Sequence, residues 1–99
     1  MLSLVKELCL LNGVSSGEDE VRAFIREKAA PYAEAMRTDA LGNLIVFKRG
    51  RKAAENRLML CAHMDEVGFL VRSVSSQGML MVLPVGSVRT FSRFMQEVV

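Results

Sequence analysis

The 99-residue sequence lacks most of the features that mark secreted and membrane proteins. It has only two cysteines, Cys9 and Cys61, and both lie inside apolar runs, so we expect buried free thiols in a reducing compartment. No stretch approaches the ~18–20 apolar residues of a membrane span. Lys6 and Glu7 interrupt the apolar pattern of the N-terminal segment, which also lacks the small-residue cleavage site of a signal peptide. These absences predict a cytoplasmic protein that has no membrane as a partner.

Charge of one sign is also scarce, because the formal net charge is only +2. The one basic run, Lys48-Arg49-Gly50-Arg51-Lys52, has no interleaved aromatic residues and no nucleic-acid-binding motif beside it. We interpret it as a solvated turn between strands and expect no nucleic acid as a partner. Hydrophobic residues make up 51% of the chain, and the mean hydropathy of +0.23 is high for so short a chain. This surplus predicts apolar surface that more of the same protein, or a partner, covers.

The first third of the chain has the periodicity of two amphipathic helices. Apolar residues recur at helical spacing over residues 2–12, and Gly13 follows as a C-terminal cap. Ser15 and Glu18 stand three residues apart, as in a capping box, and predict the start of a second helix. Pro31 should end or kink that helix.

Strand patterns follow, and we predict strands over residues 32–38, 44–47, 57–62, 67–74 and 79–85. The turn residues between Asp39 and Asn43 predict a hairpin from the first two strands. Residues 58–62 are all apolar, which is typical of a strand buried on both faces of a parallel sheet. Two helices followed by a mixed sheet around this central strand predict an α/β fold. Residues 96–99 have the character of a strand that begins as the chain finishes, and we interpret the chain as cut short.

The single histidine, His63, lies just after the apolar run and two residues before Asp65. Because side chains alternate along an extended chain, His63 and Asp65 should point to the same side, about 6–7 Å apart at the backbone. A metal-binding imidazole usually has a carboxylate on its other ring nitrogen, so this pair predicts half of a metal site. Alternation points Glu66 away from that side, and we expect a structural role for it.

Two other interpretations of His63 remain open at this point. A single His-x-Asp pair is common, and it also fits an ordinary, partly buried histidine that Asp65 satisfies by a hydrogen bond. Cys61 lies two residues before His63, so the two residues and Asp65 could form a small mononuclear metal site. We favour a core position for Cys61, because it lies deep in the apolar run.

Residues 61–71, CAHMDEVGFLV, resemble the first metal-ligand motif of the glutamyl-aminopeptidase family. These tetrahedral dinuclear-metal aminopeptidases include proteins known as cellulase M and frv-operon-like proteins. Three further stretches are similar to family motifs and occur in the same order: residues 13–18 with Val21-Arg22, residues 38–45, and residues 83–86. The resemblance therefore extends across nearly the whole chain.

The resemblance implies roles for two residues. His63 matches the histidine that binds one of two divalent metal ions, zinc or cobalt, and Asp65 matches the catalytic-site carboxylate that holds this imidazole. In such enzymes a metal-activated water attacks the peptide carbonyl, so that residues are released from the N-terminus of a peptide substrate.

The resemblance also implies a domain organisation. Residues 1–99 would be a partial catalytic domain, the N-terminal part of a zinc-peptidase-type three-layer sandwich, ending near the point where the family's dimerisation domain begins. The other metal ligands and the general base would lie beyond it, so we expect the chain to be inactive alone and to need a C-terminal portion or a homo-oligomer. The alternative is a non-catalytic α/β module that uses its sheet edge and apolar surface for interaction or self-association.

Overall fold

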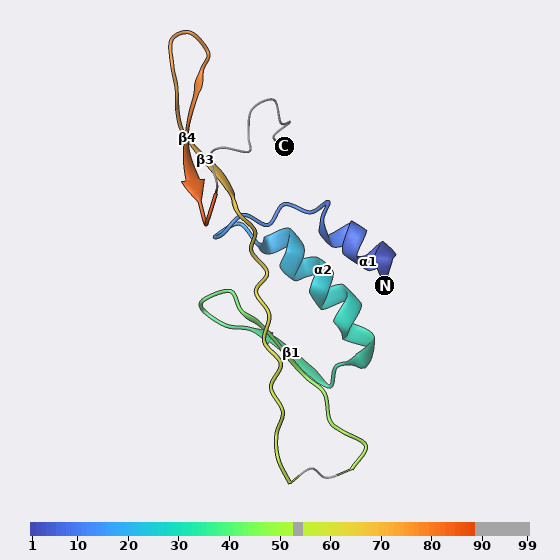
Figure 1. The fold of residues 1–99 in the computed structure, drawn as a ribbon. Helices are drawn as coiled ribbons and strands as arrows, with labels where there is room; N and C mark the ends of the chain where they lie inside the picture. Colours follow the sequence, from blue (N-terminus) through green and yellow to red (C-terminus); the bar gives the residue numbers. More distant parts are fainter. Residues whose placement is uncertain (53–54, 89–99) are drawn as a thin grey trace.

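A computed structural model describes residues 1–52 and 55–88 and shows two helices followed by two β-hairpins (Figure 1). The elements in chain order are α1 (Leu2–Leu8), α2 (Asp19–Ala29), the 3-10 turn η1 (Ala30–Tyr32), β1 (Ala35–Thr38), β2 (Leu44–Phe47), β3 (Gly68–Val74) and β4 (Leu80–Val85). The predicted α/β class, with two helices ahead of the strands, is confirmed. The strand predicted at residues 96–99 lies outside the described residues.

Charge placement and proline account for the bounds of α2. Asp19 and Glu20 lie in its first turn, where the helix dipole favours negative charge, and Arg26 and Lys28 lie in its last turn. The helix ends at Ala29 and passes into a 3-10 turn that contains Pro31, as predicted. Helix α1 is shorter than predicted and ends at Leu8, so Gly13 is not its cap. Within the described residues, no helix has the length and apolarity needed to cross a membrane.

The predicted capping box is wrong. The N-cap of α2 is Glu18, and it has no side-chain cap hydrogen bond. Instead, the Glu18 carboxylate accepts a hydrogen bond of 2.7 Å from the backbone N–H of Ser16, whose φ is +75°. The Ser15 hydroxyl is directed elsewhere, to a carboxylate 50 residues along the chain. A sequence pattern shows the three-residue spacing of a capping box, but it cannot show that the hydroxyl has a hydrogen-bond acceptor 50 residues away.

The predicted hairpin of the first two strands is confirmed. β1 and β2 pair antiparallel, with Ala35 opposite Phe47 and Thr38 opposite Leu44. In the turn, the Asp39 carboxylate accepts hydrogen bonds from the Leu41 N–H at 3.0 Å, the Asn43 N–H at 2.9 Å and the Asn43 side-chain amide at 2.9 Å. The bonds from Asn43 lower the pKa of Asp39.

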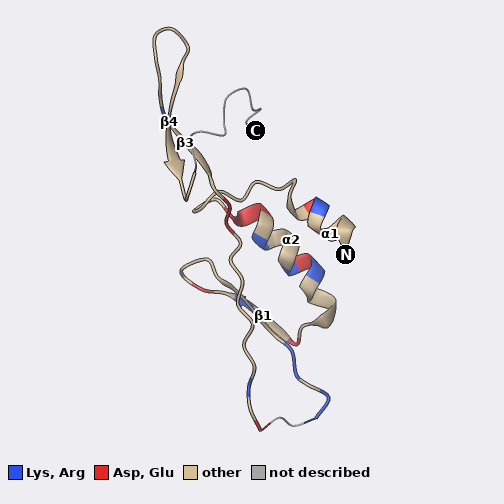
Figure 2. Cartoon of the chain, in the orientation of Figure 1, with Lys and Arg blue, Asp and Glu red and all other residues tan. Residues whose placement is uncertain are grey.

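The second hairpin pairs β3 with β4 antiparallel, and its register shifts between Val71 and Ser73. Its turn closes by a hydrogen bond of 3.0 Å from the Gly78 N–H to the Ser75 carbonyl, and Gly78 has a φ of +81°. Figure 2 shows a hairpin almost without charge, since Arg72 is the only charged residue between residues 68 and 85. The two hairpins are separate antiparallel sheets, so the predicted mixed sheet is not formed by the described residues. Parallel pairing among them is limited to an isolated bridge between Val14 and Glu66.

The strand predicted at residues 57–62 is not formed. This segment is extended but unpaired, and Leu58, Met59 and Leu60 are 86%, 82% and 86% exposed. A strand of a parallel sheet needs hydrogen-bonded neighbours, and the described residues provide none for this segment. The prediction that the cysteines are buried is also wrong: Cys9 and Cys61 are free thiols, but both are exposed.

The core of the described residues is very small. Val21 on α2, 7% exposed, is the only buried hydrophobic side chain among them. The radius of gyration is 18.2 Å, whereas a compact domain of this length has about 13 Å. Large apolar side chains are exposed on both hairpins and on residues 58–60. The apolar surface expected from the composition is therefore present.

Gly68 provides a test of how the segment around Val14 packs against the start of β3. A Cβ atom at Gly68 would lie 2.5 Å from Cγ2 of Val14, too close for any real contact. We expect Gly68→Ala to lower the free energy of unfolding by about 1–3 kcal/mol, measured by urea denaturation, because it overpacks this contact. Gly50→Ala is the matched control, since its nearest non-neighbouring atom would lie at 3.4 Å. Equal unfolding midpoints for the two variants would contradict the packing described.

Candidate functional site

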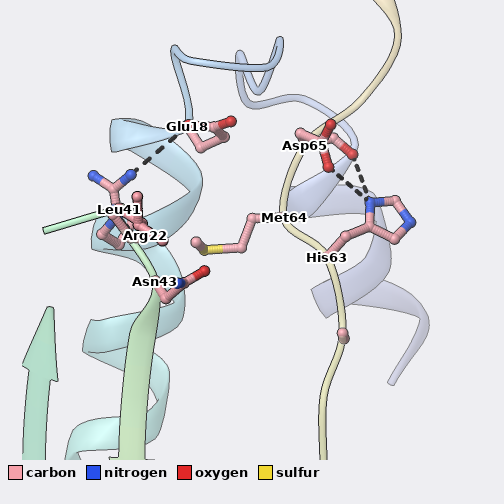
Figure 3. A pocket seen from close by; sticks show the side chains of 9 residues that line it. Glu18, Arg22, Leu41, Asn43, His63, Met64 and Asp65 are labelled. Atoms are coloured by element: carbon pink, nitrogen blue, oxygen red, sulfur yellow. Dashed lines mark hydrogen bonds and ion pairs between the residues drawn. The ribbon is translucent and has the colours of Figure 1, made fainter. Parts of the chain in front are cut away.

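Three of the four family-like stretches meet around one shallow cavity of about 170 Å³ (Figure 3). The extended segment 62–65 forms one wall, and the start of α2 and the β1–β2 turn form the other. The lining residues are Glu18, Arg22, Leu41, Gly42, Asn43, Ala62, His63, Met64 and Asp65. Stretches that lie up to 47 positions apart in the sequence, from Glu18 to Asp65, are thus neighbours in space.

Side chains alternate along the extended wall of the cavity. Figure 3 shows Met64 pointing across toward Arg22 and Asn43, while His63 and Asp65 lie together on the other side of the segment. This is the arrangement expected of an extended chain, in which residues two apart share a side. Glu66 does not line the cavity, and its backbone N–H donates a hydrogen bond of 2.7 Å to the Gly13 carbonyl.

The geometry around His63 determines which ring nitrogen carries a proton. Nδ1 lies 2.8 Å from the backbone carbonyl of Asp65 and 3.2 Å from its carboxylate Oδ1. A carbonyl and a carboxylate can only accept, so Nδ1 must be the donor. In the neutral imidazole the lone pair is then on Nε2, which is the atom left to act as a ligand. The His63 side chain is 85% exposed, so an incoming group can reach it.

Asp65 is held from its other side by Ser15. The Ser15 hydroxyl donates a hydrogen bond of 2.5 Å to Oδ2 of Asp65, and this bond is the main cause of a lowered pKa of the Asp65 carboxyl. The bond from His63 lowers the same pKa further, because both partners stabilise the ionised form. Asp65 is therefore an anion that accepts on both oxygens.

Ser15 is a site residue that the sequence pattern does not reveal, because its spacing from Glu18 predicts a helix cap. Two backbone contacts bring it to Asp65: the parallel bridge between Val14 and Glu66, and the hydrogen bond from Glu66 to Gly13. The only sequence signal that could have identified Ser15 is its place within a family-like stretch, because the periodicity gives no hint of pairing across 50 residues.

Arg22 joins the start of α2 to the β1–β2 turn. Its Nε donates a hydrogen bond of 2.7 Å to the Gly42 carbonyl, and its guanidinium forms ion pairs with Glu18, at 3.8 Å, and with Asp19. The side chain is only 19% exposed. Gly42 has a φ of +86°, and a Cβ atom there would lie 2.9 Å from Nη2 of Arg22. The glycine thus permits both the turn and the close approach of the arginine.

The fit of a metal ion to the described residues is partial. His63 offers one ligand nitrogen whose ring is oriented by a carboxylate, as in many metal sites. Within residues 1–52 and 55–88, however, no group of three or more histidine, cysteine, aspartate or glutamate side chains could hold a metal ion. The alternative of a mononuclear site from Cys61, His63 and Asp65 is therefore wrong, because the extended chain does not bring these three side chains together. A metal site that includes His63 would therefore need at least one ligand from outside the described residues.

Comparison with known proteins places these residues in context. The family model described as M42 glutamyl aminopeptidase matches residues 42–99. The chain is 34% identical over 82 residues to the glutamyl aminopeptidase of Lactococcus lactis subsp. cremoris, covering 83% of this chain and 23% of that protein.

Two crystal structures are similar as well. One, described as an endoglucanase of Thermotoga maritima, has a TM-score of 0.76 and 47% identity over 84% of this chain and 26% of its own. The other, the TET aminopeptidase of a marine sediment thaumarchaeote, has a TM-score of 0.78 and 35% identity. This match covers 87% of this chain and 23% of that protein. The chain thus spans about a quarter of the length of these proteins.

The role of Arg22 in building the cavity can be tested by a change that keeps its charge. We expect Arg22→Lys to lower the free energy of unfolding by about 1–2 kcal/mol, because an ammonium cannot reproduce the fork that reaches Gly42, Glu18 and Asp19 together. The backbone amide signals of Gly42 and Asn43 should shift in the NMR spectrum. Arg26→Lys, on the same helix, is the control and should change neither. Unchanged Gly42 and Asn43 signals in Arg22→Lys would refute this role.

Proposed function

Because the chain belongs to the M42 glutamyl aminopeptidase family, we propose that it contributes a metal ligand, His63, to the active site of a metal-dependent aminopeptidase. One observation carries the proposal: Nδ1 of His63 donates to Asp65, which leaves the lone pair on Nε2 of a side chain that is 85% exposed. Both residues lie within the stretch that the family model matches.

Each residue has a distinct task in this proposal. His63 binds the metal through Nε2, and Asp65 holds the imidazole ring in the required tautomer and orientation. A divalent metal, zinc or cobalt, would polarise a peptide carbonyl and lower the pKa of a bound water. The negative charge of Asp65, sustained by Ser15, strengthens the imidazole as an electron donor.

The wider assignment follows from the same family membership. We infer that residues 1–99 form part of the catalytic domain of a cytoplasmic peptidase that acts on the N-terminus of peptides. A catalytic zinc site needs three protein ligands, and a two-metal site needs more. The remaining ligands and the proton-transferring group would come from residues outside the described part, in the same polypeptide or in another subunit of a homo-oligomer.

A second candidate function has one observation in its favour. Residues 58–60 and the faces of both hairpins expose large apolar side chains, which is typical of surfaces that bind a partner. A non-catalytic interaction module would use these surfaces without any metal. The two functions therefore differ in their dependence on His63.

Metal binding by the protein and two single variants separates these functions. In the protein that includes the remaining ligands, we expect zinc or cobalt to bind in isothermal titration calorimetry, and His63→Ala to lose at least one binding event. Cys61→Ala is the matched control, because Cys61 is an exposed thiol two residues away that the proposal leaves without a role. Its binding isotherm should match that of the native protein.

The same three proteins should be assayed with aminoacyl substrates and with cellulose oligosaccharides, because one related structure is described as an endoglucanase. Any activity of the native protein should be toward the aminoacyl substrates and should disappear in His63→Ala. Metal binding that is equal in the native protein and His63→Ala would contradict the proposal and favour the interaction module.

A further inference from the structure

We propose that Ser15 is a positioning residue of this site: its hydroxyl fixes the Asp65 carboxylate and thereby keeps the proton of His63 on Nδ1 and the lone pair on Nε2. The effect of Ser15 on the tautomer of His63 requires no metal and is independent of the proposed function. The effect of Ser15 on metal affinity rests on the proposed function.

The three side chains form one continuous hydrogen-bonded series. The Ser15 hydroxyl is the donor to Oδ2 of Asp65, at 2.5 Å, because an ionised carboxylate can only accept. The His63 Nδ1–H is the donor to the other oxygen, Oδ1, at 3.2 Å. Since the two donors use different oxygens, both bonds exist at the same time. Ser15 thus sets the rotation of the carboxylate that the imidazole contacts.

This series is needed because two of its members, His63 and Asp65, are partly open to solvent. The His63 side chain is 85% exposed and that of Asp65 is 42% exposed, so neither is locked by packing. Ser15 is half-buried and sits on a segment that is tied to the next residue after Asp65 by the Val14–Glu66 bridge. Among the described residues, the Ser15 side chain connects His63 and Asp65 to a part of the backbone that the bridge holds in place.

The order of the series also excludes another interpretation. A serine, a histidine and an aspartate could suggest a nucleophilic triad, but there the histidine must accept the proton of the serine hydroxyl. Here Ser15 donates to Asp65, and Nδ1 of His63 also donates to Asp65 and so cannot accept a proton from the serine. Ser15 is therefore not activated for attack, and a supporting role remains.

The backbone carbonyl of Asp65 also accepts from Nδ1, at 2.8 Å, so removal of the Ser15 hydroxyl should weaken the arrangement without abolishing it. Substitution of groups that hold metal ligands usually costs 10–100-fold in affinity. Because Ser15 acts through Asp65, we expect Ser15→Ala to lower the zinc affinity by less than that, roughly three- to tenfold.

The test measures the tautomer of His63 in the metal-free protein by the ¹⁵N chemical shifts of its ring. His63 is the only histidine in the 99 residues, so its signals are unambiguous. At a pH of about 8, above the ordinary titration range of histidine, the native protein should show the Nδ1–H tautomer. Ser15→Ala should show an increased share of Nε2–H and of ring averaging, and Ser15→Thr, which keeps the hydroxyl, should restore the native shifts.

Ser16→Ala is the matched control, because Ser16 is the next residue and its side-chain hydroxyl has no hydrogen bond to the described residues. It should leave the His63 shifts and the zinc affinity unchanged. Native amide spectra of the variants would show that each one folds.

Unchanged His63 shifts in Ser15→Ala would overturn the inference, whatever the zinc affinity. Altered shifts that the threonine does not restore would also overturn it. If zinc fails to contact His63 in the native protein while Ser15→Ala still changes the tautomer, the proposed function fails and the positioning role stands.

Discussion

The contact between residues 13–15 and residues 65–66 is the constraint on which the candidate site depends. Its backbone part is the hydrogen bond from Glu66 to Gly13 and the parallel bridge from Glu66 to Val14. Its side-chain part is the hydrogen bond from Ser15 to Asp65. Without it, the described residues would hold the segment that carries His63 only by contacts within the segment, such as the bond from His63 Nδ1 to the Asp65 carbonyl.

The rest of the site is assembled around that contact by polar groups, since the core is too small to do it. Val21 alone is buried among the described hydrophobic residues. Arg22 holds the β1–β2 turn to α2 through the Gly42 carbonyl, and Met64 points from the histidine segment toward this turn (Figure 3). A large part of the apolar surface stays exposed, which agrees with a chain that spans about a quarter of the length of its relatives.

Local patterns predicted one helix and one hairpin correctly, although the predicted caps of the helices were wrong. Helical spacing and Pro31 gave α2 and its end, and the turn residues from Asp39 to Asn43 gave the first hairpin. The alternation of extended chain also placed His63 and Asp65 on one side of their segment. Each of these features depends on residues that are close together in the sequence, where periodicity and turn chemistry operate.

What the sequence could not provide is the identity of distant partners. The apolar run 58–62 indicated a buried strand, but burial and pairing need neighbours that the described residues lack. For Ser15, the local pattern predicted a helix cap, whereas its hydroxyl forms a hydrogen bond with the distant Asp65. The family-like stretches identified the residues that meet at the cavity, but only the structure showed that Ser15 and Arg22 hold them together.

The central claim is that this fold presents Nε2 of His63 as a metal ligand, and anomalous diffraction tests it most directly. Crystals of the protein grown with zinc should be measured on both sides of the zinc absorption edge. The account predicts an anomalous peak about 2.0–2.1 Å from Nε2, with Nδ1 still hydrogen-bonded to Asp65. A peak on Nδ1, or a zinc site that leaves His63 without a metal contact, would contradict it.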